Sequence, residues 1–190
     1  MSEIPLEVNG AFLINNEVFT DERGHFFEWY RKENDSGLIN FSSVSQANFS
    51  MSTCGVIRGM HYSLSPKGQD KLLLCTSGKI LDVLIDFRIG SPTFLATSTV
   101  ELEEFSGKSV FIPSGVGHGF SVHSKVATVS YLLSSEYSAD HEQTINPLDP
   151  ELGIDWRLPE VAPSLSKRDK LARSFSEAYA AKALPVFNLN

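Results

Sequence analysis

Cysteine, long apolar runs and signal-like segments are scarce in this sequence. Its two cysteines, Cys54 and Cys75, are too few for a disulfide-stabilised secreted domain, so free buried thiols in a reducing cytosol are expected. The longest apolar runs, such as 72–75, are far shorter than the ~20 residues of a membrane-spanning helix. Residues 1–5 lack the basic and apolar regions of a signal peptide, which also favours a cytoplasmic protein.

An excess of basic charge is also missing. Lys and Arg number 16 against 23 Asp and Glu, and the formal net charge is −7. No stripe of Lys and Arg stands out, so DNA and RNA are not expected as partners. A small anionic ligand is still compatible with this composition, because a local pocket with a few basic groups can bind it whatever the overall charge.

Apolar residues are abundant enough to form a sizeable core. They make up 42% of the 190 residues and include 13 Phe, which suits a single domain spanning 1–190. In the clearest predicted strand, 79–88, the apolar residues 81, 83, 85 and 87 share one face. The opposite face carries Asp82 and Asp86, which by default face solvent and otherwise line the mouth of a barrel.

Many short strands are expected between about residues 5 and 145, because alternating segments are separated by Gly, Ser and Pro turns. They are predicted at 11–15, 26–30, 44–49, 97–102, 108–112, 119–122 and 127–133. The pattern indicates an all-β sandwich or barrel. The remainder, about 146–190, is predicted as an irregular connector and a surface helix packed through Leu171, Phe175 and Tyr179.

Several polar side chains occur in or beside the predicted strands. His61 follows a glycine in the segment 58–62, Lys71 opens an apolar run, and a glycine-rich turn precedes His118. Tyr131 lies in an apolar strand, where its hydroxyl needs a partner. Each has an ordinary explanation: a lone strand His is usually a hydrogen-bonded structural residue, and a Lys entering a buried strand usually snorkels.

Asp169 is ambiguous at this level. The spacing Ser166-x-x-Asp169 is typical of a capping box at the start of a helix. On spacing alone, capping is favoured over catalysis.

A series of weak motifs follows in order along most of the chain, from about Phe19 to Asp169. They are 19–28 (FTDERGHFFE), 46–48 (QAN), 58–62 (RGMHY), 71–72 (KL), 82–88 (DVLIDFR), 90–94 (GSPTF), 112–113 with 118–120 (IP, HGF), Tyr131, 137–138 (YS), 153–156 (GIDW) and 165–166 with Asp169. In this ordered set the chain resembles the dTDP-4-dehydrorhamnose 3,5-epimerase family.

The resemblance implies a double-stranded β-helix, the cupin jelly roll, with a short C-terminal helical segment and a homodimeric assembly. It implies no cofactor and a substrate of the dTDP-4-dehydro-6-deoxy-D-glucose class, epimerised at C3 and C5. His61 matches the family's base, Asp169 its dyad partner, Tyr131 the proton donor on the opposite face, and Lys71 the cation near the ketone. Substrate-binding positions are matched by Arg23, Glu28, Gln46, Asn48, Arg58, His118, Tyr137, Glu142 and Arg168. Asp169 could therefore serve as both cap and catalyst.

Metal is not expected. Metal-binding cupins typically have a His-x-His pair followed by a carboxylate, whereas His61 is followed by Tyr62 and Ser63. His61 and His118 alone fall short of the ligands that a transition metal usually needs.

Three departures from the family pattern leave alternatives open. Ser63 stands where Gln is usual, Arg168 replaces a Lys before the dyad Asp, and 145–150 replaces a Trp-Asn-Asp type segment. None removes a catalytic group, but together they leave open a single-site (C3 or C5) epimerase. A ketoisomerase, a non-catalytic sugar-nucleotide-binding cupin and a metal-dependent cupin oxygenase are the further alternatives.

Overall fold

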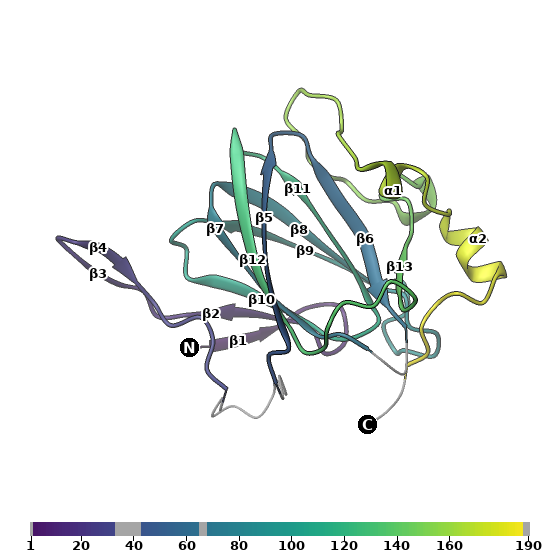
Figure 1. The fold of residues 1–190 in the computed structure, drawn as a ribbon, viewed down its shortest axis with the longest axis horizontal. Helices are drawn as coiled ribbons and strands as arrows, with labels where there is room; N and C mark the ends of the chain where they lie inside the picture. The colour runs from purple at the N-terminus through teal and green to yellow at the C-terminus, as the bar shows by residue number, and fades with distance from the viewer. Residues whose placement is uncertain (1, 33–42, 65–67, 188–190) are drawn as a thin grey trace.

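The computed structural model describes residues 2–32, 43–64 and 68–187, which fold into two large antiparallel sheets and a small hairpin (Figure 1). The six-stranded sheet has the order β1 (Ser2–Pro5), β2 (Phe12–Asn15), β10 (Lys108–Ile112), β7 (Lys71–Ser77), β12 (Val126–Leu133) and β5 (Gln46–Thr53). The five-stranded sheet has the order β13 (Glu142–Thr144), β6 (Ile57–Ser63), β11 (Val116–Val122), β8 (Lys79–Asp86) and β9 (Thr97–Glu103). This is the expected cupin jelly roll.

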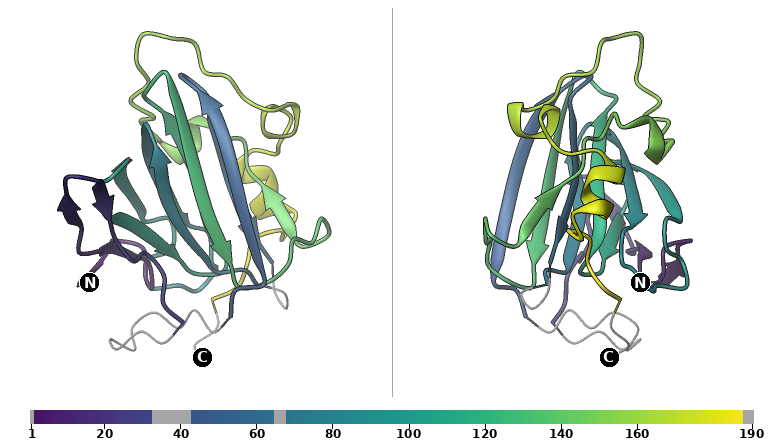
Figure 2. Two further views of the ribbon diagram at one scale, coloured as in Figure 1. Left: turned by 60° about the vertical axis from the view of Figure 1, so that its left-hand side comes forward. Right: turned by 90° about the vertical axis from the view of Figure 1, so that its right-hand side faces the viewer.

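The alternation along β8 places its two faces in two different cores. Ile80 and Leu84 pack between the sheets with apolar residues of β7, β10 and β12. Leu81 and Val83 lie on the opposite face and pack with Trp156 of the C-terminal segment. Full burial of such a side chain stabilises the fold by roughly 1.5–3 kcal/mol. The five-stranded sheet is therefore covered on both faces, as Figure 2 shows for the C-terminal segment.

The solvent-facing interpretation of the polar face of β8 is wrong. Asp82 and Asp86 are both 0% exposed. Asp86 is held by Arg88 and by the hydroxyls of Ser91 and Thr93, so the cost of burying its charge is offset by charge-assisted hydrogen bonds. Asp82 instead contacts His118.

The C-terminal segment contains short helices in place of the single helix expected: η1 (Pro150–Leu152), α1 (Lys167–Lys170) and α2 (Phe175–Ala180). Ser174 interrupts the pattern because it caps α2 in a capping box with Glu177. The backbone carbonyl of Arg173 also accepts a hydrogen bond from Asn146, which keeps this stretch extended. Leu171 is consequently 73% exposed and does not pack in the predicted stripe.

The hairpin of β3 (Phe19–Asp21) and β4 (Gly24–Phe26) projects from the body of the molecule (Figure 1). The strand predicted at 26–30 is wrong except at Phe26, the last residue of β4, and the chain beyond it packs Trp29 and Tyr30 against the outer face of the six-stranded sheet. No helix in the described parts of the chain is long and apolar enough to span a membrane.

Candidate active site

The centre of the site is a pair formed by His61 and Asp169. His61 lies on β6, and its Nε2 is 2.7 Å from Oδ1 of Asp169, which is 108 residues away in the sequence. β6 and β11 approach closely here because glycines face each other: a Cβ on Gly59 would lie 2.6 Å from the Cα of Gly119. Gly59 also has a φ of +142°, which side-chain-bearing residues rarely adopt. Glycine at 59 therefore fixes the local position of His61.

Asp169 serves both as a helix residue and as the partner of His61. Its backbone N–H donates to Oγ of the cap residue Ser166 at 3.0 Å, while its buried carboxylate reaches His61. Burial raises the pKa of Asp169. The hydrogen bond and charge of His61 and the hydrogen bond of Ser166 lower this pKa by more than burial raises it, so the net value lies below the ordinary 3.8. Asp169 is thus an ionised acceptor at neutral pH, and the proton between the pair belongs to His61 Nε2.

Lys71 begins β7 on the opposite sheet and is only 9% exposed. Burial lowers its pKa, and the nearby charges of Glu142 and Asp82 oppose that change. Among the described residues, no carboxylate comes within ion-pair distance of its Nζ. Lys71 is therefore a buried amine that lies near two acids, Glu142 and Asp82, without forming an ion pair with either.

A cavity of about 370 Å³ opens beside these groups. The five-stranded sheet contributes His61 and His118, and the six-stranded sheet contributes Lys71 and Tyr131. The full lining is Gln46, Asn48, Arg58, His61, Gln69, Lys71, His118, Phe120, Tyr131, Leu133, Tyr137 and Glu142. An imidazole and a phenol thus meet the same space from two different sheets.

The polar side chains at the cavity edge hold one another in place. Gln46 donates from Nε2 to Oδ1 of Asn48 at 2.8 Å and accepts the backbone N–H of Tyr137 at 2.8 Å. Arg58 donates from Nε to Oγ of Ser52 at 2.9 Å. The strand of Gln46, β5, is thereby tied to the loop that carries Tyr137.

A second imidazole–carboxylate pair lies next to the first. His118 is opposite His61 in the β6–β11 ladder, and its Nε2 is 2.7 Å from Oδ1 of Asp82. This contact was not anticipated from the sequence.

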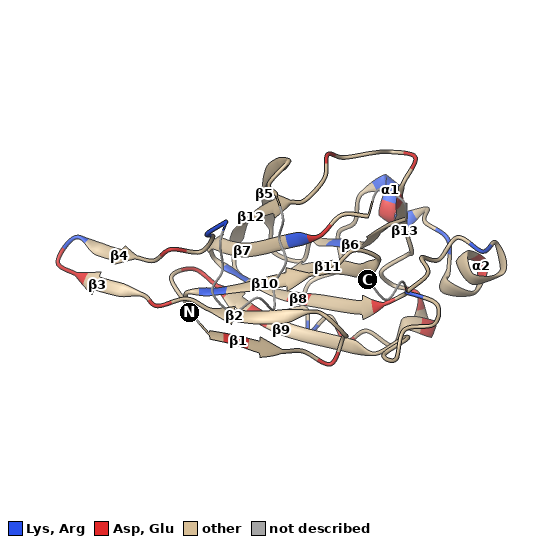
Figure 3. Cartoon of the chain, turned by 90° about the horizontal axis from the view of Figure 1, so that it is seen from below, with Lys and Arg blue, Asp and Glu red and all other residues tan. Residues whose placement is uncertain are grey.

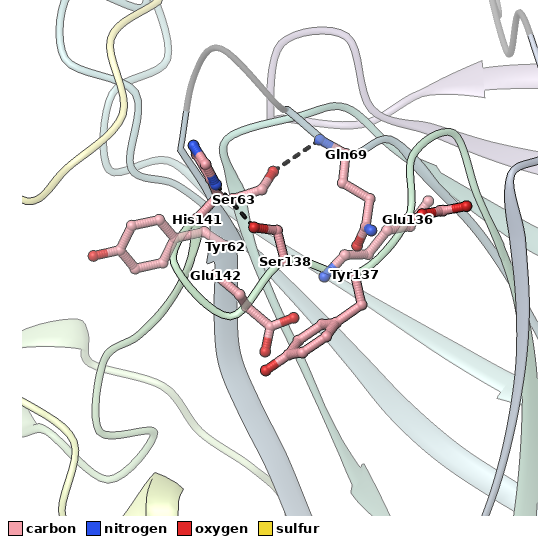
Figure 4. A pocket seen from close by; sticks show the side chains of 9 residues that line it. Tyr62, Ser63, Gln69, Glu136, Tyr137, Ser138, His141 and Glu142 are labelled. Atoms are coloured by element: carbon pink, nitrogen blue, oxygen red, sulfur yellow. Dashed lines mark hydrogen bonds between the residues drawn. The ribbon is translucent and has the colours of Figure 1, made fainter.

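A smaller polar pocket adjoins the cavity, and Figure 4 shows the side chains that line it. Ser63 accepts the backbone N–H of Gln69 at 2.9 Å, and Ser138 contacts Nδ1 of His141 at 2.9 Å. Glu142 belongs to both pockets. Ser63, which stands where the family usually has Gln, therefore makes a local hydrogen bond at the edge of the site.

Four of the predicted site residues do not line the cavity: Asp169, which lies behind His61, and Arg23, Glu28 and Arg168. Arg23 lies near the tip of the hairpin, where acidic and basic residues occur together (Figure 3), and it pairs with Asp21. Glu28 pairs with Arg31 outside the cavity. Arg168 contacts Glu142 at 2.8 Å and so joins α1 to β13.

Four residues of the site were missed by reasoning from the sequence: Gln69, Asp82, Phe120 and Leu133. A signal for two of them existed, since Phe120 and Leu133 stand two positions from His118 and Tyr131 on the same strands. Side chains two apart on a strand share a face. Asp82 carried no comparable signal, because its partner depends on how β8 and β11 pair.

Within the described residues, no three side chains of His, Cys, Asp or Glu are grouped so as to hold a metal ion. Cys54 and Cys75 are free thiols; Cys75 is buried and Cys54 only partly so. Burial raises the pKa of Cys75 to about 11.

The family model described as dTDP-4-dehydrorhamnose 3,5-epimerase matches residues 5–177. The chain belongs to this family. It is 40% identical over 185 residues to the dTDP-4-dehydrorhamnose 3,5-epimerase of Mycobacterium tuberculosis, covering 95% of this chain and 90% of the relative. It is also 40% identical over 184 residues to the dTDP-4-dehydrorhamnose 3-epimerase of Streptomyces niveus, covering 96% and 88%.

The fold of the chain also matches that of a solved epimerase structure. The crystal structure of NovW, a 4-keto-6-deoxy sugar epimerase from the novobiocin gene cluster of Streptomyces spheroides, superposes with a TM-score of 0.93 at 39% identity, covering 98% of this chain and 94% of that one. The protein is accordingly an isomerase of the dTDP-4-dehydrorhamnose 3,5-epimerase family.

Proposed function

We propose that this enzyme inverts both C3 and C5 of dTDP-4-dehydro-6-deoxy-D-glucose and so forms dTDP-4-dehydro-L-rhamnose. The observation that carries the proposal is the placement of His61, with its carboxylate partner Asp169, and of Tyr131 on different sheets around one cavity. Inversion needs a base on one side of the carbon and a proton donor on the other, and this cavity offers both.

The roles follow from the chemistry of each group. Nδ1 of His61 takes the proton from the carbon beside the ketone, because Nε2 is engaged by Asp169. The carboxylate then stabilises the imidazolium that forms. Lys71 stabilises the enolate oxygen, and Tyr131 returns a proton from the opposite face. Each positioned acid or base contributes on the order of 10²–10⁴-fold to the rate.

The remaining cavity groups are proposed to hold the nucleotide and the sugar. Arg58 is the cavity cation suited to the pyrophosphate, since a guanidinium binds phosphate oxygens in a bidentate manner. Gln46, Asn48 and Tyr137, linked by their hydrogen bonds, form a polar rim beside it. Glu142 contacts the sugar end, and Arg168 acts through its ion pair with Glu142.

Arg23 and Glu28 point to a homodimer. Both are expected at the substrate, yet they lie outside the cavity of their own chain, on or next to the projecting hairpin. We therefore propose that the hairpin of one protomer lies against the cavity of its partner. The exposed aromatic pair Phe19 and Phe26, at 56% and 70%, supports this role, because burial in an interface would remove that apolar surface from water.

The six-stranded sheet offers further apolar surface for such a dimer. Phe49 and Met51 on its edge strand β5 are 68% and 64% exposed. We place the enzyme in the cytoplasm, without a cofactor.

Epimerisation at C3 alone is the second candidate. It is favoured by one observation, the equal 40% identity to the Streptomyces niveus 3-epimerase.

Proton NMR of dTDP-4-dehydro-6-deoxyglucose incubated with the enzyme in D₂O separates the two reactions. Loss of both the C3 and C5 proton signals supports the double epimerase, and loss at one carbon only supports the single-site enzyme. No exchange at either carbon would refute the proposed substrate. In parallel, His61→Ala must abolish the exchange.

A further inference from the structure

The active-site cavity is served by two imidazole–carboxylate pairs of the same geometry. His61 and His118 both line the cavity, they are directly opposite each other in the β6–β11 ladder, and each Nε2 is 2.7 Å from a carboxylate oxygen. Proton abstraction by His61 accounts for Asp169. It leaves the second carboxylate, Asp82, without a role.

Asp82 is a costly residue at its position. It lies on the inward face of β8 between Ile80 and Leu84, and all three are 0% exposed. Its Oδ1 contacts His118, but its Oδ2 is buried and has no partner among the described residues. A buried polar atom without a hydrogen bond costs on the order of 1–3 kcal/mol, and more when the group is charged. Its neighbours on the inward face of β8 are apolar, so the one polar contact that the carboxylate makes, with His118, is the feature that sets this position apart.

The groups around Asp82 are those that would act on the substrate. Asp82 does not line the cavity itself, whereas its partner His118 does. Lys71 lies on the other sheet, and the negative charge of Asp82 raises its pKa, whereas burial lowers it. One buried anion therefore sits behind a cavity-facing imidazole and near a cavity-facing amine.

We propose that Asp82 is a positioning residue for the epimerisation, acting through His118. Its carboxylate accepts a hydrogen bond from Nε2 of His118 and favours the doubly protonated ring, so that the N–H of Nδ1 is left to donate to the substrate. Within the described residues, Nδ1 has no protein partner. Held in this way, His118 donates to the enolate oxygen together with Lys71, and Asp82 compensates the positive charge on the imidazole. The inference rests on the proposed function, because it assumes the enolate formed by His61.

A double-mutant cycle of Asp82→Asn and His118→Gln tests the inference in the full-length enzyme. Asp82→Asn keeps the side-chain shape and removes the charge, so kcat is expected to fall on the order of 10–100-fold. KM is expected to change less than about 3-fold, because the interaction strengthens when the enolate forms. The double variant is expected to be no slower than His118→Gln alone, since Asp82 acts only through that ring.

The matched control is Asp86→Asn on the same strand. Asp86 is equally buried, but its partners are Arg88, Ser91 and Thr93, and it does not line the cavity. This variant should lower the melting temperature and leave kcat of the folded enzyme unchanged. A comparable fall in kcat in both variants would mean that any lost buried charge disturbs the barrel, and it would overturn the inference.

Imidazole ¹⁵N NMR of the unmodified enzyme provides a test that does not depend on a folded variant. The ring of His118, assigned by its loss in His118→Gln, should carry protons on both Nε2 and Nδ1. A neutral ring would overturn the inference, as would additive losses in the double variant or an unchanged kcat in Asp82→Asn. His61→Asn is measured alongside: if that variant still exchanges substrate protons, the proposed function fails, whatever Asp82 does.

Discussion

Replacing Asp169 by Asn removes one charge from the centre of the site and leaves its shape. The amide can offer its NH₂ to Nε2 of His61, which would move the ring proton to Nδ1, the nitrogen that must accept the substrate proton. The related change in a serine protease triad lowers kcat by about 10⁴-fold through the wrong tautomer. We expect a fall of about 10²–10⁴-fold in kcat and a much smaller change in KM.

The same substitution has a stability consequence with a definite pH dependence. Because the pKa of Asp169 in the folded protein lies below the ordinary 3.8, the carboxylate stabilises the fold above that value, and the contribution is lost as the pH falls through the folded value. A hydrogen bond to a charged group is worth about 1.5–3 kcal/mol. For a chain of this size that corresponds to about 3–12 °C in melting temperature.

The assay is the exchange of the C3 and C5 protons in D₂O, combined with thermal unfolding at pH 7 and near pH 3. Ser166→Ala is the matched control, since it removes the cap of α1, worth about 1 kcal/mol, and keeps the carboxylate. It should cost stability and only a few-fold in rate. A folded Asp169→Asn enzyme with kcat within about 3-fold of the unmodified enzyme would refute the dyad.

Three further outcomes are expected. Tyr131→Phe should keep the exchange of substrate protons for deuterium by His61 and lose net inversion, because the opposite face then lacks its proton donor. NMR of substrate and product distinguishes exchange from inversion, and normal inversion would exclude Tyr131 as donor. Lys71→Met should lower kcat by about 10²–10³-fold. Because burial lowers the pKa of Lys71 below 10.5, the activity of the unmodified enzyme should fall at alkaline pH before exposed lysines titrate. The pH–rate profile of Lys71→Met should lack this alkaline fall. Phe49→Glu should shift sedimentation towards the monomer, and an unchanged profile would place the interface elsewhere.

The strands could be predicted because their alternation is local. The face of β8 with Leu81 and Val83 was identified correctly, and the apolar run that opens at Lys71 proves to be the strand β7. The strand predicted at 26–30 shares only Phe26 with β4. The C-terminal helix was predicted as one piece because its spacing of four hid the cap residue Ser174. Caps and strand ends depend on contacts that a periodic pattern does not contain.

The site was predictable where a residue type matched a family motif, and less so where pairing between strands decides the contact. His61 and Tyr131 were assigned from motifs, and the structure places both on one cavity. Asp82 was missed because only the β8–β11 ladder brings it to His118. The solvated interpretation of Asp82 failed for the same reason: a single strand does not reveal that both of its faces will be covered.

The dyad is closed by a part of the chain that comes after the barrel. His61 lies on a strand of the barrel, whereas Asp169 lies on the one-turn helix α1, which is too short to be stable alone and is held by Ser166 and by the contact of Arg168 with Glu142. During synthesis the strands emerge first, and the barrel can form its cavity before His61 has its carboxylate partner. In the proposed mechanism the catalytic histidine therefore acquires its carboxylate partner last, after every strand of the barrel has been synthesised.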